Sequence, residues 1–265
     1  MVSRDIILKV IGVIVVVSAV VGGIVWLDKH DRGAMTKPEI TPADKQAIQE
    51  QMKGMPMVFQ KNEGQTDSTA LFLVKNGSTS IYFTSSDIVF QYIQTTKADD
   101  EKTADTGKGL VLRQSFIDAN TASSITGEQQ LKSKVNYFIG NDKSKWVSGA
   151  PTFAQVRYAQ VYPGVDLVFS GTGSKLSQTY ALSAGIKPEI IQIRITGADS
   201  LEIDGNGVLA IKTALGNIGQ AKPVITQEIG GKTITREATY VLIDTQTYGI
   251  RGMGLDTNAP TTISW

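Results

Sequence analysis

The sequence predicts a mainly β protein, an antiparallel β-sandwich that follows an N-terminal transmembrane helix. Three observations support this prediction: an apolar run near the N-terminus, many short runs of β-branched and aromatic residues after it, and turn-forming residues between those runs. The chain of 265 residues is long enough for one large sandwich or for two small sandwich subdomains behind the helix.

The apolar run covers residues 10–27 and contains no charged side chain. A run of this length spans the hydrocarbon core of a bilayer when it is helical. We therefore expect residues 1–28 to be an uncleaved, single-pass signal-anchor in the cell membrane, with the C-terminal domain outside. The residues expected to lie in the bilayer or at its interface are Val10, Val15, Val20, Trp26 and Leu27.

Two other interpretations of this segment stay open. Residues 17–19, Val-Ser-Ala, resemble a signal-peptide cleavage site, although the apolar run continues beyond them to Leu27. In the second, the helix lies in the core of a pilin-like surface filament, because small residues permit close contact between helices. The small residues on this helix are Ser18, Ala19, Gly22 and Gly23.

Residues 29–56 are expected to form a linker and a short helix. The first part is polar and contains glycine and proline, which is typical of a linker. Thr41 and Pro42 are typical of a helix N-terminus, so we expect a helix from Pro42 to about Lys53.

Residues 57–265 are expected to form the extracytoplasmic β-sandwich domain. Turn residues at 76–77, 204–207 and 230–231 predict hairpins. The charged, weakly hydrophobic segment 97–108 is expected to be a surface loop and a point at which the domain divides. Further strands are predicted at residues 87–95, 109–116, 134–139, 165–170, 175–182, 190–196, 237–243 and 248–253.

The composition excludes several function classes. With no cysteine and one histidine, the chain has no disulfide, thiolate metal site, thiol nucleophile or histidine-rich metal cluster. Since 26 Lys and Arg residues oppose 25 Asp and Glu residues, the net charge of +1 gives no reason to expect a nucleic-acid partner. Neither a phosphate-binding loop nor a nucleophile elbow is present. We therefore expect no catalytic residue, no cofactor and no metal site.

Aromatic residues concentrate in the middle of the chain. Most such residues on strands belong to a core, but Trp146 follows a turn and is a candidate for surface binding, with a glycan as one kind of partner. The aromatic residues of this region are Tyr137, Phe138, Trp146, Phe153, Tyr158, Tyr162 and Phe169.

Three segments carry a family resemblance: residues 59–67 (FQKNEGQTD), 135–146 (VNYFIGNDKSKW) and 150–169 (APTFAQVRYAQVYPGVDLVF). They resemble the successive signatures of an uncharacterised β-rich domain near the N-terminus of bacterial cell-surface proteins, which often precedes SBBP-type β-propeller repeats. The similarity extends over about residues 57–265. The chain departs from the family at residues 176–180 (LSQTY), where an acidic, aromatic strand is usual. The resemblance implies export, a β-rich fold and a cell-surface setting, and it brings no established catalytic residues.

Together these observations predict a membrane-anchored, extracytoplasmic, non-catalytic protein that acts by interaction, as an adhesin-like module or a surface-assembly subunit. The expected partners are the lipid bilayer and a protein partner or a second copy of the chain, with a glycan as a further option. A pilin-like filament subunit is the first alternative, and a glycan-binding or glycan-acting surface domain is the second.

Overall fold

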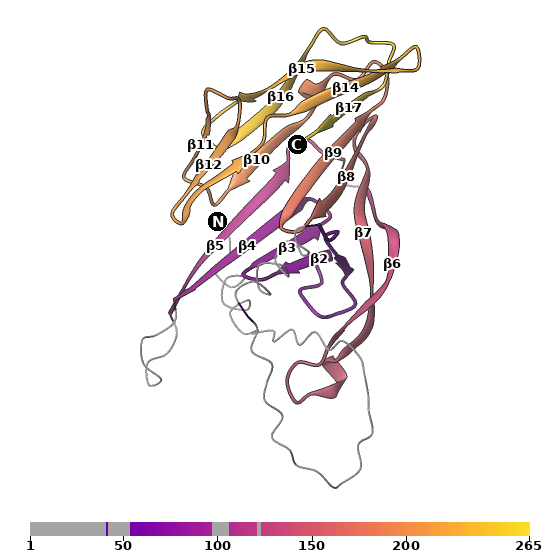
Figure 1. Cartoon of the computed structure of the whole chain (residues 1–265). Coiled ribbons are helices and arrows are strands. Elements are labelled where there is room, and N and C mark those ends of the chain that lie inside the picture. Colours follow the sequence, from indigo (N-terminus) through magenta and orange to yellow (C-terminus); the bar gives the residue numbers. More distant parts are fainter. Residues whose placement is uncertain (1–40, 42–53, 97–105, 121–122) are drawn as a thin grey trace.

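The computed structural model describes residues 41, 54–96, 106–120 and 123–265 (Figure 1). The anchor predicted at residues 1–28 and the helix predicted from Pro42 to Lys53 lie outside the described residues. In the described part of the chain, no helix combines the length and the apolar character that crossing a membrane requires.

A single antiparallel sheet of 14 strands makes up most of the described fold, which confirms the prediction of a mainly antiparallel β protein. In sheet order the strands are β1 (Phe59–Lys61), β2 (Ala70–Asn76), β3 (Thr79–Thr84), β4 (Asp87–Thr96), β5 (Thr106–Phe116), β10 (Gln192–Thr196), β16 (Thr247–Met253), β15 (Lys232–Leu242), β14 (Val224–Ile229), β17 (Thr261–Ser264), β9 (Lys175–Leu182), β8 (Val165–Thr172), β7 (Val147–Tyr162) and β6 (Ser124–Tyr137).

This sheet closes on itself, because β1 pairs with β7 as well as with β2. Phe59 lies opposite Phe153 on β7, and Gln60 lies opposite both Thr152 on β7 and Leu73 on β2. The large sheet is therefore one continuous sheet in which β6 stays at an edge. The finer prediction that its strands stack as a sandwich stays a prediction.

A second, small sheet contains β11 (Ser200–Ile203), β12 (Leu209–Thr213) and β13 (Gly216–Gln220). The side-chain amide of Gln220 donates hydrogen bonds to the hydroxyls of Tyr240 (2.9 Å) and Tyr248 (3.0 Å), which ties this sheet to the large one. The described helical elements are two short 3-10 helices, η1 (Lys143–Lys145) and η2 (Pro188–Ile190).

Alternation of apolar and polar residues explains why these segments are strands. On β8, Val165, Leu167 and Phe169 are fully buried, whereas Asp166 and Val168 between them are half-buried. Successive side chains of a strand point to opposite faces, so this pattern directs one face into the core.

Aromatic side chains from several strands meet inside the closed sheet. The ring of Phe83 on β3 lies 5.4 Å from that of Phe59 on β1 and 5.1 Å from that of Phe169 on β8. Tyr158 on β7 contacts Phe169 at 5.7 Å. The contact between Phe83 and Phe169 joins β3 and β8, which do not pair with each other, so the core helps to hold the two sides of the sheet together.

The predicted hairpin turns are confirmed where the structure describes them. Gly77 lies between β2 and β3 with φ of +58°, and Gly230 and Gly231 lie between β14 and β15 with φ of +59° and +74°. The turn at 204–207 joins β11 to β12. The surface loop predicted at 97–108 is too long by three residues, because residues 106–108 belong to β5 and pair with β4. The division of the domain at this segment stays a prediction.

The strands β6 and β7 form a long ribbon whose end extends beyond β8 and β9, and η1 lies in the loop at this end (Figure 1). The ribbon therefore places one loop well away from the bulk of the described sheet.

Candidate functional site

The end of the β6–β7 ribbon presents large apolar side chains to solvent. We call residues 138–146 the tip loop. In it, Phe138 is 58% exposed, Ile139 is 38% exposed and Trp146 is 38% exposed. Exposed apolar groups that lie together usually mark an interaction surface.

The base of the tip loop is buried and fixed to β1. Tyr137, the last residue of β6, is buried, and its hydroxyl donates a hydrogen bond to Oε1 of the buried Gln60. Burial and the nearby Tyr82 raise the pKa of Tyr137 to about 12. The neutral phenol thus remains a hydrogen-bond donor, and the loop begins from a rigid point.

Hydrogen bonds within the loop give it a defined shape. Asp142 caps η1, and its Oδ1 accepts hydrogen bonds from the backbone amide of Ser144 (3.1 Å) and from its hydroxyl (2.6 Å). These bonds lower the pKa of Asp142. The indole Nε1 of Trp146 donates to the carbonyl oxygen of Gly140 (3.1 Å), and Gly140 has φ of +73°, a conformation that favours glycine.

The two exposed rings contact each other. The ring centroids of Phe138 and Trp146 are 5.2 Å apart, with the planes inclined at 58°. The ammonium group of Lys143 lies 5.7 Å from the centroid of the Trp146 ring, within the range of a cation–π interaction. An aromatic pair and a cation therefore share one small surface.

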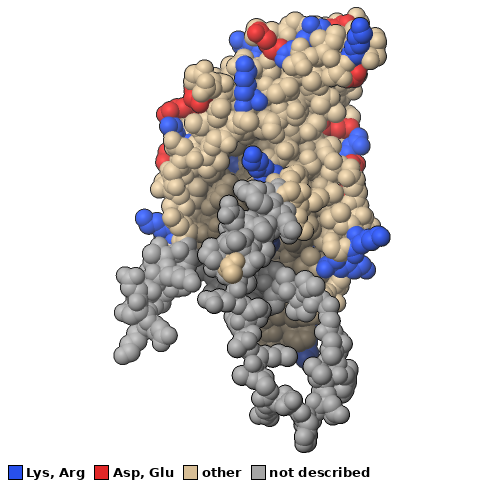
Figure 2. All heavy atoms as spheres, viewed as in Figure 1, with Lys and Arg blue, Asp and Glu red and all other residues tan. Residues whose placement is uncertain are grey.

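The tip loop and the adjoining end of β6 are basic. Residues 132–146 contain four lysines, at positions 132, 134, 143 and 145, and one acidic residue, Asp142, which gives a formal charge of +3. All four lysines are exposed. On the face drawn in Figure 2, basic side chains gather over β6 and β7 without acidic neighbours at that level.

By contrast, the segment 59–67 has a role in the fold. The side-chain amide of Asn62 donates to the carbonyl oxygens of Asp67 (2.8 Å) and Ala70 (2.7 Å). Its Oδ1 accepts hydrogen bonds from the backbone amides of Gly64 and Thr66. Asn62 thus organises the turn between β1 and β2.

The segment 150–169 likewise contains an internal support. Gln160 interrupts the register of β7 and β8 with φ of +54°, and its backbone amide donates to Oδ1 of Asp166 (2.7 Å). The Arg157 guanidinium donates to the other oxygen of Asp166. Burial works to raise the pKa of Asp166, but the hydrogen bonds from Gln160 and Arg157 outweigh it, so the pKa is lowered.

The aromatic residues selected in the sequence divide into two groups. Tyr137, Tyr158, Tyr162 and Phe169 are buried and Phe153 is half-buried, as expected for core positions. Phe138 and Trp146 are exposed and adjacent. Trp146 is the surface-binding candidate predicted from the sequence, because it follows a turn. Phe138 belongs to the predicted aromatic group but is not a predicted binding residue, and neither Ile139 nor the Gly140 carbonyl is predicted to contribute. Alternation along β6, with Tyr137 inward, was the signal that placed Phe138 outward.

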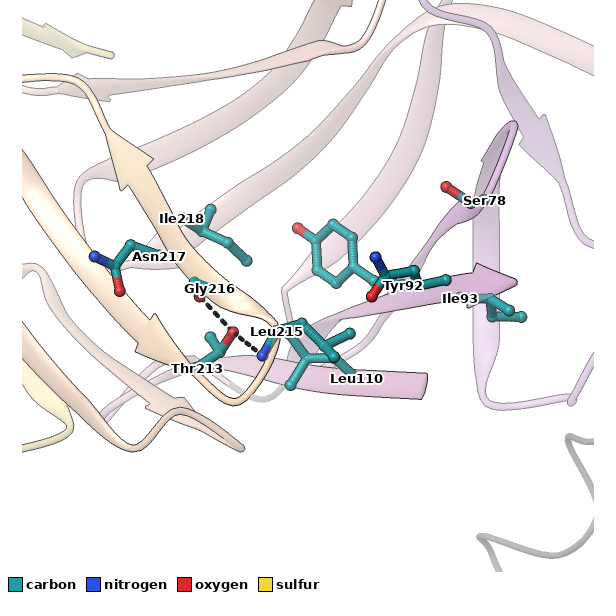
Figure 3. A pocket seen from close by; sticks show the side chains of 10 residues that line it. Ser78, Tyr92, Ile93, Leu110, Thr213, Leu215, Gly216, Asn217 and Ile218 are labelled. Atoms are coloured by element: carbon teal, nitrogen blue, oxygen red, sulfur yellow. Dashed lines mark hydrogen bonds between the residues drawn. The ribbon is translucent and has the colours of Figure 1, made fainter. Parts of the chain in front are cut away.

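A shallow pocket lies between the β4–β5 hairpin and the turn that joins β12 to β13 (Figure 3). Its volume is about 260 Å³, and the Thr213 hydroxyl holds the turn by donating to the Gly216 carbonyl (2.6 Å) and accepting from the Leu215 amide (3.2 Å). The described residues that line it include no Asp, Glu or His. They are Ser78, Tyr92, Ile93, Gln94, Leu110, Thr213, Leu215, Gly216, Asn217 and Ile218.

The membrane and helix-contact residues predicted from the sequence are not part of this geometry. Within the described ranges, no group of three or more Asp, Glu or His residues is placed to hold a metal ion. The residues that lie outside the described part are Val10, Val15, Val20, Trp26 and Leu27 of the predicted anchor, and Ser18, Ala19, Gly22 and Gly23 of the predicted helix contact.

Comparison with known proteins gives one match. A family model described as "Domain of unknown function (DUF7948)" matches residues 59–264. No curated protein and no solved structure matches the chain. The matched range contains all three segments that carry the resemblance, including the tip loop.

Proposed function

The chain belongs to the DUF7948 family of domains of unknown function, and from this premise we propose that it is a membrane-anchored, extracytoplasmic, non-catalytic interaction protein of the cell surface. The tip loop, residues 138–146, is its binding surface. The observation that carries this proposal is the exposed contact between Phe138 and Trp146 at the end of a rigid ribbon.

The difference between the three family segments supports this choice of surface. Asn62 and Asp166 have their side chains occupied in turns and in a β-bulge. The segment 135–146 instead directs the side chains of Phe138 and Trp146 to solvent, and neither belongs to the buried core. Aromatic residues that become buried in an interface supply a large part of its binding free energy.

The location rests on features outside the closed sheet. The apolar run at 10–27 supports an anchor in the membrane. The resemblance to a domain that precedes SBBP-type repeats in bacterial surface proteins supports an outside position for the β domain. A domain held at the cell surface can bind partners near that surface. The tip loop lies at the end of the β6–β7 ribbon, beyond β8 and β9 (Figure 1).

Location is tested with a single introduced cysteine, since the chain has none. Lys232 is the exposed first residue of β15, next to the β14–β15 turn, and the variant is Lys232→Cys. In cells that express the full chain, a membrane-impermeant maleimide is expected to label this position without permeabilisation. Labelling only after permeabilisation contradicts the proposal.

Interaction is tested with a double variant, Phe138→Ala with Trp146→Ala. The matched control is Leu242→Ala with Ile243→Ala, because these side chains are also apolar and are 40% and 51% exposed. On intact cells, Asn141→Cys is expected to be protected from the impermeant maleimide in the unmodified background and in the control variant, and to be labelled in the tip variant. Equal labelling of position 141 in all three backgrounds contradicts a binding role for the tip loop.

A further inference from the structure

The tip loop combines the side chains that favour the interface of an anionic bilayer. Trp146, Phe138 and Ile139 are exposed together, and tryptophan favours the headgroup level of a membrane. Lysine side chains extend their ammonium groups toward headgroups while their stems cover apolar surface. The lysines at 132, 134, 143 and 145 surround the apolar group in sequence.

Asp142 cancels the charge of one of the four lysines, so the segment keeps a formal charge of +3. Its Oδ1 accepts both hydrogen bonds from Ser144, and its Oδ2 lies 3.8 Å from Nζ of Lys145. Each lysine near an anionic membrane surface contributes about 1 kcal/mol of attraction. The basic excess of the loop therefore complements anionic lipid headgroups.

The position of the loop is consistent with contact to the membrane that anchors the chain. The described chain enters the fold at Gly54, and β1 follows it directly. β1 pairs with β7 at Thr152 and Phe153, and Gln60 on β1 binds Tyr137 at the base of the tip loop. The chain coming from the predicted anchor thus reaches the domain at a strand that contacts the base of the tip loop.

A sugar ligand fits this surface less well. Sugars commonly bind by placing a ring against an open aromatic face, whereas Lys143 lies over the Trp146 ring at 5.7 Å and Phe138 contacts the same ring. The loop carries one carboxylate to bind hydroxyl groups, and that carboxylate is engaged by Ser144. Charge and ring packing both favour an anionic lipid surface.

We propose that the tip loop inserts its apolar side chains at the interface of the anchoring bilayer and binds anionic, phosphate-bearing lipid headgroups through its lysines, holding the β domain against the membrane. This inference rests on the proposed function, because it names the partner of the same surface. The proposed partner is an anionic lipid, and binding of a glycan or a protein instead would contradict the proposal.

The test uses the full chain in lipid nanodiscs with a single environment-sensitive NBD label. The label is attached at Asn141→Cys in the tip loop, or at Lys232→Cys at the start of β15 as the control position. The discs contain phosphatidylcholine alone or phosphatidylcholine mixed with phosphatidylglycerol. We expect blue-shifted, several-fold stronger emission from the label at position 141 in the anionic discs only, and no lipid dependence at position 232.

Charge variants separate lipid binding from loop folding. Lys143→Glu with Lys145→Glu is expected to abolish the lipid-dependent change at position 141, whereas the control pair Lys187→Glu with Lys232→Glu, also exposed, is expected to retain it when read at the same label. Equal emission in both lipids, or a change that appears only when a cell-wall glycan or a second copy of the chain is added, overturns the lipid proposal.

The two proposals fail in distinguishable ways. Loss of the lipid effect together with labelling of Lys232→Cys on intact cells removes the lipid partner and leaves the surface interaction protein. Failure of that labelling removes the proposed function, even when the loop binds lipid in discs.

Discussion

The indole Nε1 of Trp146 donates a hydrogen bond to the carbonyl oxygen of Gly140 across 3.1 Å. The bond closes the tip loop on itself and holds an exposed ring against Phe138. An exposed side chain that is already fixed loses less conformational entropy when it binds. The loop is therefore ordered before it meets a partner.

Replacement of Trp146 separates the hydrogen bond from the ring contact. Trp146→Phe keeps an aromatic ring and removes the donor, so we expect faster amide exchange in residues 140–146 and a loss of about 1 kcal/mol in the free energy of unfolding. Trp146→Ala also removes the ring contact and is expected to cost about 2 kcal/mol. Hydrogen-exchange mass spectrometry and denaturant unfolding measure these effects. Exchange in Trp146→Phe as slow as in the unmodified chain shows that the bond does not order the loop.

Gly197 tests the contact between β10 and β5. It has φ of +90°, and a Cβ atom there would lie 2.2 Å from the carbonyl oxygen of Val111 on β5. We expect Gly197→Ala to lower the free energy of unfolding by about 3 kcal/mol through overpacking and backbone strain. Gly254→Ala is the control, because Gly254 also has positive φ but has open space, and about 1 kcal/mol is expected there. Urea unfolding that shows equal losses argues against the close approach of β10 and β5.

Asp166 tests the bulge in β7. Asp166→Asn removes the carboxylate that accepts from Gln160 and Arg157, so we expect a loss of about 2 kcal/mol in unfolding free energy at neutral pH. Because the pKa of Asp166 is lowered from 3.8 in the folded chain, its stabilising effect is present above pH 3.8 and is lost as the pH falls through the lower, folded value.

The pH dependence gives Asp166→Asn its own control. The difference in stability between the unmodified chain and this variant is expected to shrink as the pH falls below 3.8. Glu237→Gln, at an exposed position of β15, is expected to leave the urea midpoint unchanged. A difference that stays constant down to the acid limit contradicts the ionic role of Asp166.

Tyr137 gives the corresponding effect in alkali. Its pKa rises from 10.0 to about 12 on folding, so its stabilising effect is complete below pH 10 and is lost as the pH rises through 12. Tyr137→Phe cannot ionise, and we expect it to lose less stability than the unmodified chain between pH 10 and 12. At neutral pH it is expected to cost about 1 kcal/mol, because Gln60 loses its partner. If the free energies of unfolding in urea of the unmodified chain and of Tyr137→Phe change in parallel between pH 10 and 12, this account of Tyr137 is wrong.

Local features of the fold were predictable from the sequence, because they depend on neighbouring residues. The turn at Asn76-Gly77 needs a residue that tolerates positive φ, and Gly77 supplies it. The alternation on β8 likewise follows from residues two apart. The closure of the sheet was not predictable, since β1 has three residues and shows no period, and its pairing with β7 joins residues that are distant along the chain.

The candidate site was predictable in part. The turn before Trp146 indicated that this side chain is exposed, and in the structure Trp146 is 38% exposed. The contact of Phe138 with Trp146 was not predicted, because the predicted strand runs to residue 139, whereas β6 ends at Tyr137. The positive φ of Gly140 and the cap at Asp142 turn the chain there, so that Phe138 returns to Trp146. Such a contact depends on loop geometry that residue types alone do not determine.

The most direct test of the tip loop as a binding surface is a footprint on intact cells. Full-length chains with Asn141→Cys or Lys232→Cys are treated with a membrane-impermeant maleimide, and each labelling yield is normalised to that of the unfolded chain. The account predicts that Lys232→Cys is labelled freely and that Asn141→Cys is protected, with protection lost in the Phe138→Ala, Trp146→Ala background. Equal labelling of both positions on intact cells would contradict it.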